Sequence, residues 1–355
     1  MENVKIMVVD DTITYRQILS NVVETLDGAE LAATASSGKT ALMKIPSIKP
    51  HLIFLDIMMP EMDGIETLHA IKKDYPMIQI VMVSGFDLEN AKATLQSLED
   101  GALDFIPKPV VENMEAGIRQ LQTSLQPLVD LVRSKVFKDL KISPVIIPKP
   151  VIEITKAERK KLEGPINLVL IGISTGGPNA LHKLFELMQT RLTCPVMIVQ
   201  HMPPMFTKSL AERLNSVSPM EIIEAENEDI LTEGRVYIAP GGKHMVVRGK
   251  TDGSMRIGIT DAPPVNHCKP AVDVLFRSVA GIKNANPLSV IMTGMGRDGT
   301  EGIKTLRRKG TYCLIQDEKT SVVWGMPGSV YEADCADEIL PLEKIADRII
   351  QLTSE

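Results

Sequence analysis

Residues 167–178 read NLVLIGISTGGP, and this stretch decides the fold of the second half of the chain. Its apolar residues, 168–171, are typical of a strand that is buried on both faces of a parallel sheet. The glycines permit a sharp turn after the strand, and proline is favoured in the first turn of a helix. The stretch therefore predicts a strand, a tight turn and a helix, which is the unit from which α/β domains are built.

The same alternation continues through the second half of the chain. Further strand candidates lie at residues 195–199, 221–224, 235–239, 245–248, 256–259, 288–292 and 312–315. Helical patterns fit residues 178–189, 207–214, 272–280 and 301–309. We predict a Rossmann-like, doubly wound parallel sheet with a small antiparallel insertion near residues 234–260.

The first half of the chain predicts a second α/β domain. Short apolar runs lie at residues 5–9, 30–35, 51–55, 78–83 and 104–106, and helical patterns between them at 14–26, 65–74 and 89–99. Units of this size predict a five-stranded, doubly wound parallel sheet. In such sheets, functional side chains collect at the carboxyl ends of the strands.

A proline-containing segment separates the two halves. Residues 142–150 read ISPVIIPKP, and their three prolines break helices and favour an extended chain. A length of 355 residues also favours two domains. We therefore predict a first domain at residues 1–124, a helical extension and linker at 125–164, and a second domain at 165–355.

Charge and cysteine content exclude several classes of protein. The net charge of −6 argues against non-specific nucleic-acid binding. The four cysteines, at positions 194, 268, 313 and 335, form no C-x-x-C pair, which indicates reduced thiols rather than a zinc cluster or a disulfide framework. We see no signal peptide and no apolar run long enough to span a bilayer. We expect a cytoplasmic protein without membrane insertion, which meets any membrane-bound substrate at its cytoplasmic part.

Three carboxylates are expected at one edge of the first sheet. Asp10 and Asp11 follow the first predicted strand, and Asp56 ends the third. Their mutual repulsion is costly unless a cation lies among them, and Mg²⁺ prefers oxygen ligands of this kind. The sequence therefore predicts a Mg²⁺ site formed by Asp10, Asp11 and Asp56.

Two further side chains at that edge suit a phosphoryl group. Ser84 ends the fourth predicted strand, and Lys108 follows the fifth, so that a hydroxyl and an ammonium join the carboxylates. Taken alone, Asp10-Asp11 also fits a turn or a helix cap, and Lys108-Pro109 fits an ordinary loop. Their joint occurrence at the ends of the expected strands favours a binding site.

These motifs resemble the receiver domain of response regulators over residues 3–122. The matching residues are Val9-Asp10-Asp11, Asp56 with 59–64 (MPEMDG), Ser84, and Phe105 with Pro107-Lys108-Pro109. The resemblance implies that Asp56 accepts a phosphoryl group from a histidine kinase and that Asp10 or Asp11 holds Mg²⁺ with it. It also implies that Lys108 pairs with the phosphate and that Ser84 and Phe105 are the switch residues.

The turn at 172–176 fits the G-x-S-x-G pattern that exposes a nucleophilic serine, here Ser174. Backbone N–H groups near 175–177, at the start of a helix, would be available to stabilise an oxyanion. A phosphate or dinucleotide cradle is the first alternative, although the lysine of a P-loop and the G-x-G-x-x-G spacing are both absent. A structural serine on a tight turn is the second alternative.

A serine nucleophile requires a base, and His201 has the best position among the four histidines in the second half of the chain. It follows the apolar run 195–200, which is expected to lie next to the strand of Ser174. His182 is expected on a helix surface, and His244 and His267 are loop candidates. Asp298, in the turn after the apolar run 288–292, is the candidate for orienting the imidazole. Asp298 also fits a helix N-cap, and it serves both purposes only if its carboxylate turns toward His201.

The order Ser174, His201, Asp298 differs from the order of α/β-hydrolases and directs us to a narrower family. Residues 166–352 resemble the CheB-type chemotaxis methylesterases. The motifs that carry the resemblance are 174–178 (STGGP), 200–204 (QHMPP), 239–244 (APGGKH), 272–276 (VDVLF), 293–299 (TGMGRDG), 316–318 (QDE) and 325–327 (GMP).

This second resemblance implies an enzyme, a carboxylic ester hydrolase. Ser174 would be the nucleophile, His201 the base and Asp298 the orienting acid, and Thr175, Gly176 and Met295 would line the oxyanion and substrate site. The substrates would be glutamate γ-methyl esters on the cytoplasmic helices of chemoreceptors, with deamidation of receptor glutamines as a second activity. A CheA-type histidine kinase would donate the phosphoryl group, and no metal is expected in this half.

The resemblance has departures and rivals. Ile173 stands where the family often has a small residue, and Cys268-Lys269 follows His267 where an arginine is common. One rival is a response regulator whose second half binds DNA or protein without catalysis. Another is a generic hydrolase that uses Asp229 and His267. The family also implies that the unphosphorylated receiver covers the active site, so that phosphorylation activates the enzyme.

Overall fold

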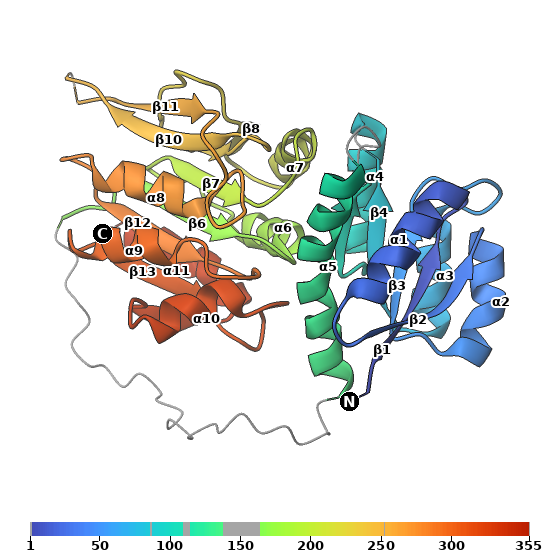
Figure 1. Ribbon diagram of the computed structural model, residues 1–355. Helices are drawn as coiled ribbons and strands as arrows, with labels where there is room; N and C mark the ends of the chain where they lie inside the picture. The colour runs from blue at the N-terminus through green and yellow to red at the C-terminus, as the bar shows by residue number, and fades with distance from the viewer. Residues whose placement is uncertain (1, 86, 109–113, 138–163, 252, 355) are drawn as a thin grey trace. The chain divides into compact units, whose positions relative to one another are not determined.

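The computed structural model describes residues 2–85, 87–108, 114–137, 164–251 and 253–354. The chain divides into two compact units, residues 1–157 and 158–355 (Figure 1), and each is described by itself. The proline-containing segment 142–150 lies outside the described residues. None of the described helices combines the length and the apolar character needed to cross a membrane.

The first unit is built on a five-stranded parallel sheet. Its strands are β1 (Val4–Val9), β2 (Ala29–Ala35), β3 (Leu52–Asp56), β4 (Gln79–Ser84) and β5 (Asp104–Pro107). Their order is β2-β1-β3-β4-β5, and every neighbouring pair is parallel. The predicted five-stranded fold is confirmed. In this order Asp10, Asp56 and Ser84 leave the sheet at one edge, because β1, β3 and β4 are neighbours.

Helices cover both faces of this sheet. They are α1 (Ile13–Thr25), α2 (Gly38–Ile48), α3 (Gly64–Asp74), α4 (Leu88–Glu99) and α5 (Met114–Val136). Helix α1 packs against α5, and α3 packs against α2 and α4. We gave no bounds for α2, which contains Pro46 within its range. Its start is fixed by Ser37, whose hydroxyl accepts a hydrogen bond from Thr40 N.

The second unit contains a seven-stranded parallel sheet. Its strands are β6 (Leu168–Ile173), β7 (Val196–Gln200), β8 (Glu221–Glu224), β9 (Arg235–Ile238), β12 (Pro287–Ile291), β13 (Tyr312–Gln316) and β14 (Glu338–Leu340). The order is β14-β13-β12-β6-β7-β9-β8. The predicted parallel sheet is confirmed. From β6 the chain moves to β7 on one side, whereas β12 joins on the other, so the crevice at the carboxyl end of β6 is a topological switch point.

The predicted insertion is a two-stranded antiparallel ribbon, β10 (His244–Gly249) and β11 (Met255–Thr260). The range that we predicted for it, 234–260, was too wide. Residues 235–238 form β9, which pairs in parallel with β7 and β8 in the main sheet.

Six helices flank the larger sheet in the described part of the chain. They are α6 (Gly177–Leu187), α7 (Phe206–Asn215), α8 (Val272–Ala280), α9 (Thr300–Arg307), α10 (Gly325–Glu332) and α11 (Leu342–Ser354). Helix α9 packs against α8 and α10, and α6 packs against α7 and α11. Strands β6, β7 and β12 are buried along their whole length. Their loops are therefore anchored on strands that are fully buried.

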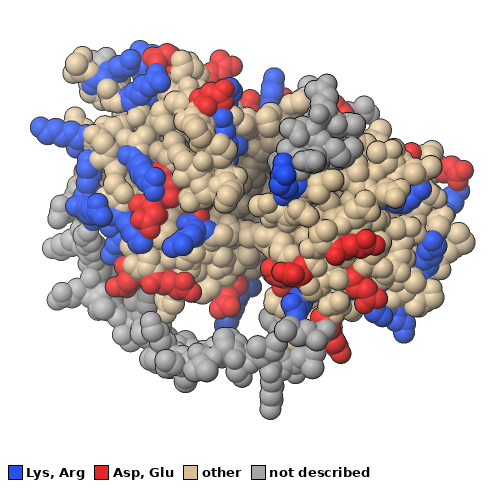
Figure 2. Space-filling view, in the orientation of Figure 1, with Lys and Arg blue, Asp and Glu red and all other residues tan. Residues whose placement is uncertain are grey.

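Charged side chains are mixed on the surface of the second unit. In the view of Figure 2, Lys and Arg side chains are interspersed with Asp and Glu side chains over this unit. A broad basic field, which nucleic-acid binding requires, is not a feature of that visible face.

Candidate functional site

Ser174 lies directly after β6, at the centre of the larger sheet. Its N–H donates to Thr293 O at 3.0 Å, and its carbonyl oxygen accepts from Gln200 Nε2 at 3.0 Å and from Gly177 N at 2.7 Å. These bonds tie the turn to the strands on both sides. The backbone that presents the Ser174 hydroxyl is therefore fixed.

The glycines around this turn are required by close approach. Gly176 has a φ of 75°, in the left-handed region that favours glycine. A Cβ atom on Gly177 would collide with Gln200 Oε1, and one on Gly294 would lie 2.8 Å from Ser174 Cβ. Gly176 of the G-x-S-x-G pattern, together with Gly177 and Gly294 beside it, thus has a steric basis in this fold.

His201 lies next to Ser174 because β6 and β7 pair in register. Ile173 pairs with Gln200 across the two strands, so Ser174 and His201 each follow one member of this pair. His201 N also donates to Ile173 O at 3.2 Å. Neighbouring parallel strands are about 4.8 Å apart, which places both residues at one edge of the sheet.

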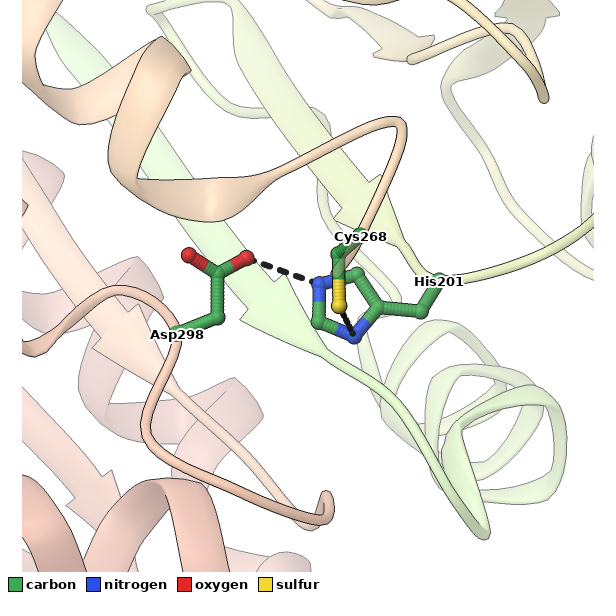
Figure 3. A group of neighbouring side chains, drawn as sticks. All are labelled: His201, Cys268 and Asp298. Atoms are coloured by element: carbon green, nitrogen blue, oxygen red, sulfur yellow. Dashed lines mark hydrogen bonds and ion pairs between the residues drawn. The ribbon is translucent and has the colours of Figure 1, made fainter. Parts of the chain in front are cut away.

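The His201 imidazole is held between Asp298 and Cys268 (Figure 3). Its Nε2 lies 2.8 Å from Asp298 Oδ2, and its Nδ1 lies 3.5 Å from Cys268 Sγ. Burial disfavours the charged ring, but the bonds to Asp298 and Cys268 outweigh burial and raise the pKa of His201 to about 10. The imidazolium is therefore the resting form at neutral pH.

Asp298 is fixed by more partners than the imidazole alone. Its carboxylate is 1% exposed and accepts hydrogen bonds from the N–H groups of Val272 (2.6 Å), Asp273 (3.1 Å) and Gly299 (3.1 Å). Burial raises the pKa of Asp298, but its bond to His201 outweighs burial and keeps that pKa below its ordinary value. The carboxylate thus remains ionised beside the N-terminus of α8, where a negative charge is stabilised.

The contacts of Asp298 bear on both interpretations of this residue. The carboxylate does turn toward His201, and it does cap a helix, but the helix is α8 and not α9. Helix α9 begins after Gly299, which has a φ of 94° and no side-chain cap. The N-cap pattern in the sequence was therefore assigned to the wrong helix.

Two polar residues at this site escaped the sequence analysis. Asn266 Nδ2 donates to Asp298 Oδ1 at 2.8 Å and to Asp273 Oδ2 at 3.0 Å. Asp273 is 1% exposed and also accepts from Gly302 N at 2.7 Å. The φ of Asn266 is 53°, a conformation that asparagine tolerates better than most residues. The sequence signal that could have identified this residue is an asparagine six residues before the start of α8.

The expected oxyanion residues surround the Ser174 turn. Thr175 O accepts a hydrogen bond from Thr293 Oγ1 at 3.0 Å, and Gly176 is the N-cap of α6. Met295 follows Gly294, whose carbonyl oxygen accepts from Gly325 N (3.1 Å) and Met326 N (2.8 Å). The loops after β6 and β12 are therefore braced by the start of α10.

Asp229 and His267, the residues of the rival hydrolase, do not form a hydrogen-bonded pair in the part of the chain that the structure describes. Asp229 Oδ2 accepts from Glu226 N at 2.8 Å, and His267 is exposed with a φ of 62°. His244 is buried and bonds Pro263 O through Nε2 and Ala271 N through Nδ1. No hydrogen bond joins Asp229 to His267 among the described contacts.

A bond from Ser174 Oγ to His201 is likewise not among the described contacts, and the Nδ1 atom of His201 faces Cys268.

The first unit gathers the predicted acidic cluster. Oxygens of Asp10, Asp11 and Asp56 lie within 4.8 Å of one another, and Lys108 Nζ is 3.1 Å from Asp10 Oδ2 and 2.8 Å from Asp56 Oδ2. Burial raises the pKa of Asp56 to about 6, with Lys108 opposing the rise. Burial also raises the pKa of Asp10. Two buried carboxylates and one ammonium leave a surplus of negative charge at this edge.

This cluster fits a hard cation. Asp10 Oδ2 and Asp56 Oδ2 are buried without a hydrogen-bond donor, although Lys108 lies within ion-pair distance of both. Buried carboxylate oxygens with unfilled capacity are the ligands that Mg²⁺ prefers. The donor set at this edge is therefore consistent with the predicted magnesium site.

The loop after β3 explains the 59–64 motif. A Cβ atom on Gly64 would collide with the Asp56 carbonyl oxygen, and Gly64 N donates to Ile57 O at 2.8 Å. Asp63 and Glu66 form a reciprocal capping box at the start of α3. Beyond β4, Ser84 Oγ accepts from Thr94 Oγ1 at 2.8 Å, and Phe105 is half-buried on β5. The Asp56 loop is thus closed tightly onto the sheet.

Comparisons with known proteins match the two units to two different families. Residues 169–349 match the family model described as CheB methylesterase, and residues 6–118 match the response regulator receiver domain. A protein of Trichodesmium erythraeum (strain IMS101) is 41% identical over 99% of both chains, and one of Desulfotalea psychrophila is 42% identical over 99% of this chain and 98% of that one. Both are named protein-glutamate methylesterase/protein-glutamine glutaminase.

One solved structure resembles the second unit. The Thermotoga maritima CheB methylesterase catalytic domain is 39% identical and aligns with a TM-score of 0.51. The alignment covers 53% of this chain and the whole of that domain.

Proposed function

The chain belongs to the CheB methylesterase family with an attached receiver domain, and we propose that it demethylates chemoreceptors by a Ser174-His201-Asp298 mechanism. It is a carboxylic ester hydrolase that acts on protein glutamate γ-methyl esters and on protein glutamines. The observation that carries the mechanism is the His201–Asp298 bond beside Ser174 at the switch point of the sheet.

In the proposed reaction, Ser174 Oγ adds to the ester carbonyl carbon while its proton passes to His201. Because Nε2 is held by Asp298, Nδ1 is the ring nitrogen left for this proton. His201 then protonates the departing methoxide, which gives methanol and an acyl-enzyme. A water molecule repeats the sequence and releases glutamate. With glutamine as substrate, ammonia leaves in place of methanol.

The surrounding residues suit two supporting roles. Asp298 is oriented by the amides at the start of α8, so that it stabilises the imidazolium formed during each step. The turn that contains Thr175 and Gly176, together with the Met295 loop, would hold the oxyanion at the N-terminal end of α6. Removal of one such donor typically costs about 10²–10³ in rate.

The receiver half is proposed to control this activity. Asp56 would accept a phosphoryl group from a CheA-type histidine kinase as an acyl phosphate, with Lys108 pairing with the phosphate oxygens. Asp10, Asp11 and Asp56 would hold Mg²⁺, which when bound supplies positive charge at the phosphorylated edge. Ser84 and Phe105 would report the phosphorylation, and the enzyme would act in the cytoplasm on the cytoplasmic helices of the receptors.

The decisive experiment measures methanol released from a methylated receptor, with and without a small phosphodonor. We expect release to increase with the donor and to fall at least about 10³-fold in Ser174→Ala. A fluorophosphonate probe should label the wild-type chain and not this variant. If Ser174→Ala keeps both the label and methanol release, the second half is not a Ser174 hydrolase. A chain without either activity would instead favour the non-catalytic response regulator.

A further inference from the structure

Cys268 lies against the catalytic imidazole without a part in the proposed reaction. Cys194, Cys313 and Cys335 are buried, whereas the side chain of Cys268 is partly exposed. Its Sγ lies 3.5 Å from His201 Nδ1, and Figure 3 shows the sulfur and the Asp298 carboxylate next to different nitrogens of the same ring. A thiol at this position adds a soft ligand to a site that otherwise has only nitrogen and oxygen.

The three side chains form a donor set that suits zinc. One atom each from His201, Cys268 and Asp298 lies within 4.8 Å of the others. Thiolate, imidazole and carboxylate are the ligands found in zinc sites, with bonds of about 2.0–2.3 Å. Tetrahedral geometry then places two ligand atoms about 3.3–3.6 Å apart. Asp298 and Cys268 lie next to different nitrogens of the ring, so a cation bound at Nε2 beside Asp298 requires the Cys268 side chain to rotate toward that nitrogen.

The surroundings orient these ligands in advance. Asp298 is fixed by the amides of Val272 and Asp273 and by Asn266, and such outer bonds are what hold a ligand toward a metal. The backbone of Cys268 is held by two hydrogen bonds with Val265, at 2.9 Å and 3.1 Å. The thiol side chain is then the part that adjusts.

We propose that His201, Cys268 and Asp298 form a binding site for a thiophilic divalent cation such as Zn²⁺, and that its occupancy inhibits the esterase. The inhibition rests on the proposed function, because a metal bound at His201 removes the base that Ser174 requires. Binding displaces the thiol proton and the proton shared by His201 and Asp298 to solvent. The acidic cluster of the receiver offers only oxygens, so the two metal sites differ in ligand chemistry.

Metal binding is tested first, independently of catalysis. The intact chain in excess Mg²⁺ is titrated with Co²⁺, and the sulfur-to-cobalt charge-transfer absorption is recorded. We expect the band in the wild-type chain and in Ser174→Ala, which keeps all three ligands. We expect its loss in Cys268→Ser and in Cys268→Ala, and its retention in the matched control Cys335→Ser. A band that survives both substitutions of Cys268, or no band in the wild type, overturns the site.

Inhibition is tested by methanol release with Zn²⁺, followed by a chelator. Each rate is expressed relative to the same variant without metal. Wild type should be inhibited reversibly, and Cys268→Ser should need at least about tenfold more Zn²⁺ for half-inhibition. Equal Zn²⁺ sensitivity in both overturns the inhibitory role. If the cobalt band behaves as expected while Ser174→Ala still releases methanol, the proposed reaction fails and the metal site stands.

Discussion

At the scale of single residues, the charge on His201 controls when the enzyme can act. The pKa of His201 is raised from about 6.5 to about 10, so the ring is protonated at neutral pH and cannot accept the proton of Ser174. Below the pKa, the neutral fraction of the imidazole grows about tenfold for each unit by which the pH rises. The site is therefore expected to become more active as the solution becomes more alkaline.

We predict that kcat/KM for a soluble methyl-ester peptide rises with pH from about 7 to about 9. Because Cys268 contributes to the raised pKa, Cys268→Ser should shift this rise to lower pH. Cys335→Ser, which alters a buried cysteine that bonds Ala333 O and has no described contact with the imidazole, is the control. A pH profile of Cys268→Ser that coincides with that of the wild type would remove Cys268 from this electrostatic role.

Burial of Asp56 has an electrostatic cost, because it disfavours the charged carboxylate. Burial raises its pKa to about 6, so the folded state holds the proton more tightly than the unfolded state, whose value is about 3.9. A group with a raised folded pKa contributes stability below the unfolded value, and this contribution is lost as the pH rises through the folded value. Ionised Asp56 thus destabilises the metal-free fold at neutral pH.

We predict that Asp56→Asn abolishes labelling by a phosphodonor and stabilises the metal-free protein at pH 7. The gain relative to the gain at pH 4 should be on the order of 1–3 kcal/mol, measured by urea unfolding with a chelator present. Addition of Mg²⁺ should stabilise the wild type more than the variant. Stoichiometric labelling of the variant, or a stability difference that does not change with pH, would contradict this account.

At the scale of elements, the turn after β12 is shaped by the turn after β6. A Cβ atom on Gly294 would lie 2.5 Å from Met326 Sδ and 2.8 Å from Ser174 Cβ. Met326 is fully buried, and the amides of Gly325 and Met326 hold the Gly294 carbonyl in place. A methyl group at this position must displace the nucleophile or the start of α10.

We predict that Gly294→Ala destabilises the catalytic unit by about 1–3 kcal/mol and lowers kcat more than it raises KM. Gly281→Ala is the matched control, since its Cβ would approach Ser278 O only to 3.4 Å and its φ is −75°. Thermal melts and steady-state kinetics of both variants provide the measurement. Wild-type kinetics in Gly294→Ala would show that the two turns are not coupled.

The strands and helices also show which parts of the fold the sequence predicts. Apolar runs such as 168–171 predict buried strands correctly, because burial on both faces is a local pattern. The pairing partner of a strand is a long-range property, which is why 235–238 was placed in the antiparallel insertion instead of the main sheet. The bounds of helix α2 were not predicted, and it contains Pro46, although a proline in the interior of a helix normally ends it.

The candidate site likewise contains residues whose place the sequence predicts and residues whose place it does not. The meeting of Ser174, His201 and Asp298 at one edge could be predicted, because each follows a strand of a parallel sheet. The roles of Asn266 and Cys268 could not, because both lie on the irregular loop before α8, whose path no periodic pattern specifies. The contact between Asp298 and the α8 amides is likewise a product of packing between α8 and α9.

At the scale of the whole molecule, the two compact units allow the receiver to be removed. A fragment of residues 164–355 keeps the bonds from Asn286 Nδ2 to Gly164 O (3.1 Å) and Pro165 O (3.2 Å) that anchor the start of β6. It also corresponds to the solved catalytic domain from Thermotoga maritima. The fragment is therefore expected to fold alone.

We predict that this fragment hydrolyses receptor methyl esters faster than the intact, unphosphorylated chain. If the receiver keeps 99% of the intact enzyme inactive, phosphorylation must supply only about 2.7 kcal/mol of differential stabilisation to make half of it active. Negative charge of about −1.5 to −2 at Asp56 is a sufficient source for a bias of this size. A phosphodonor should accordingly accelerate the intact chain and leave the fragment unchanged, whereas intact Asp56→Asn should stay slow. Equal rates for the fragment and the unphosphorylated chain would mean that the receiver acts by recruiting the enzyme to its substrate and not by inhibition.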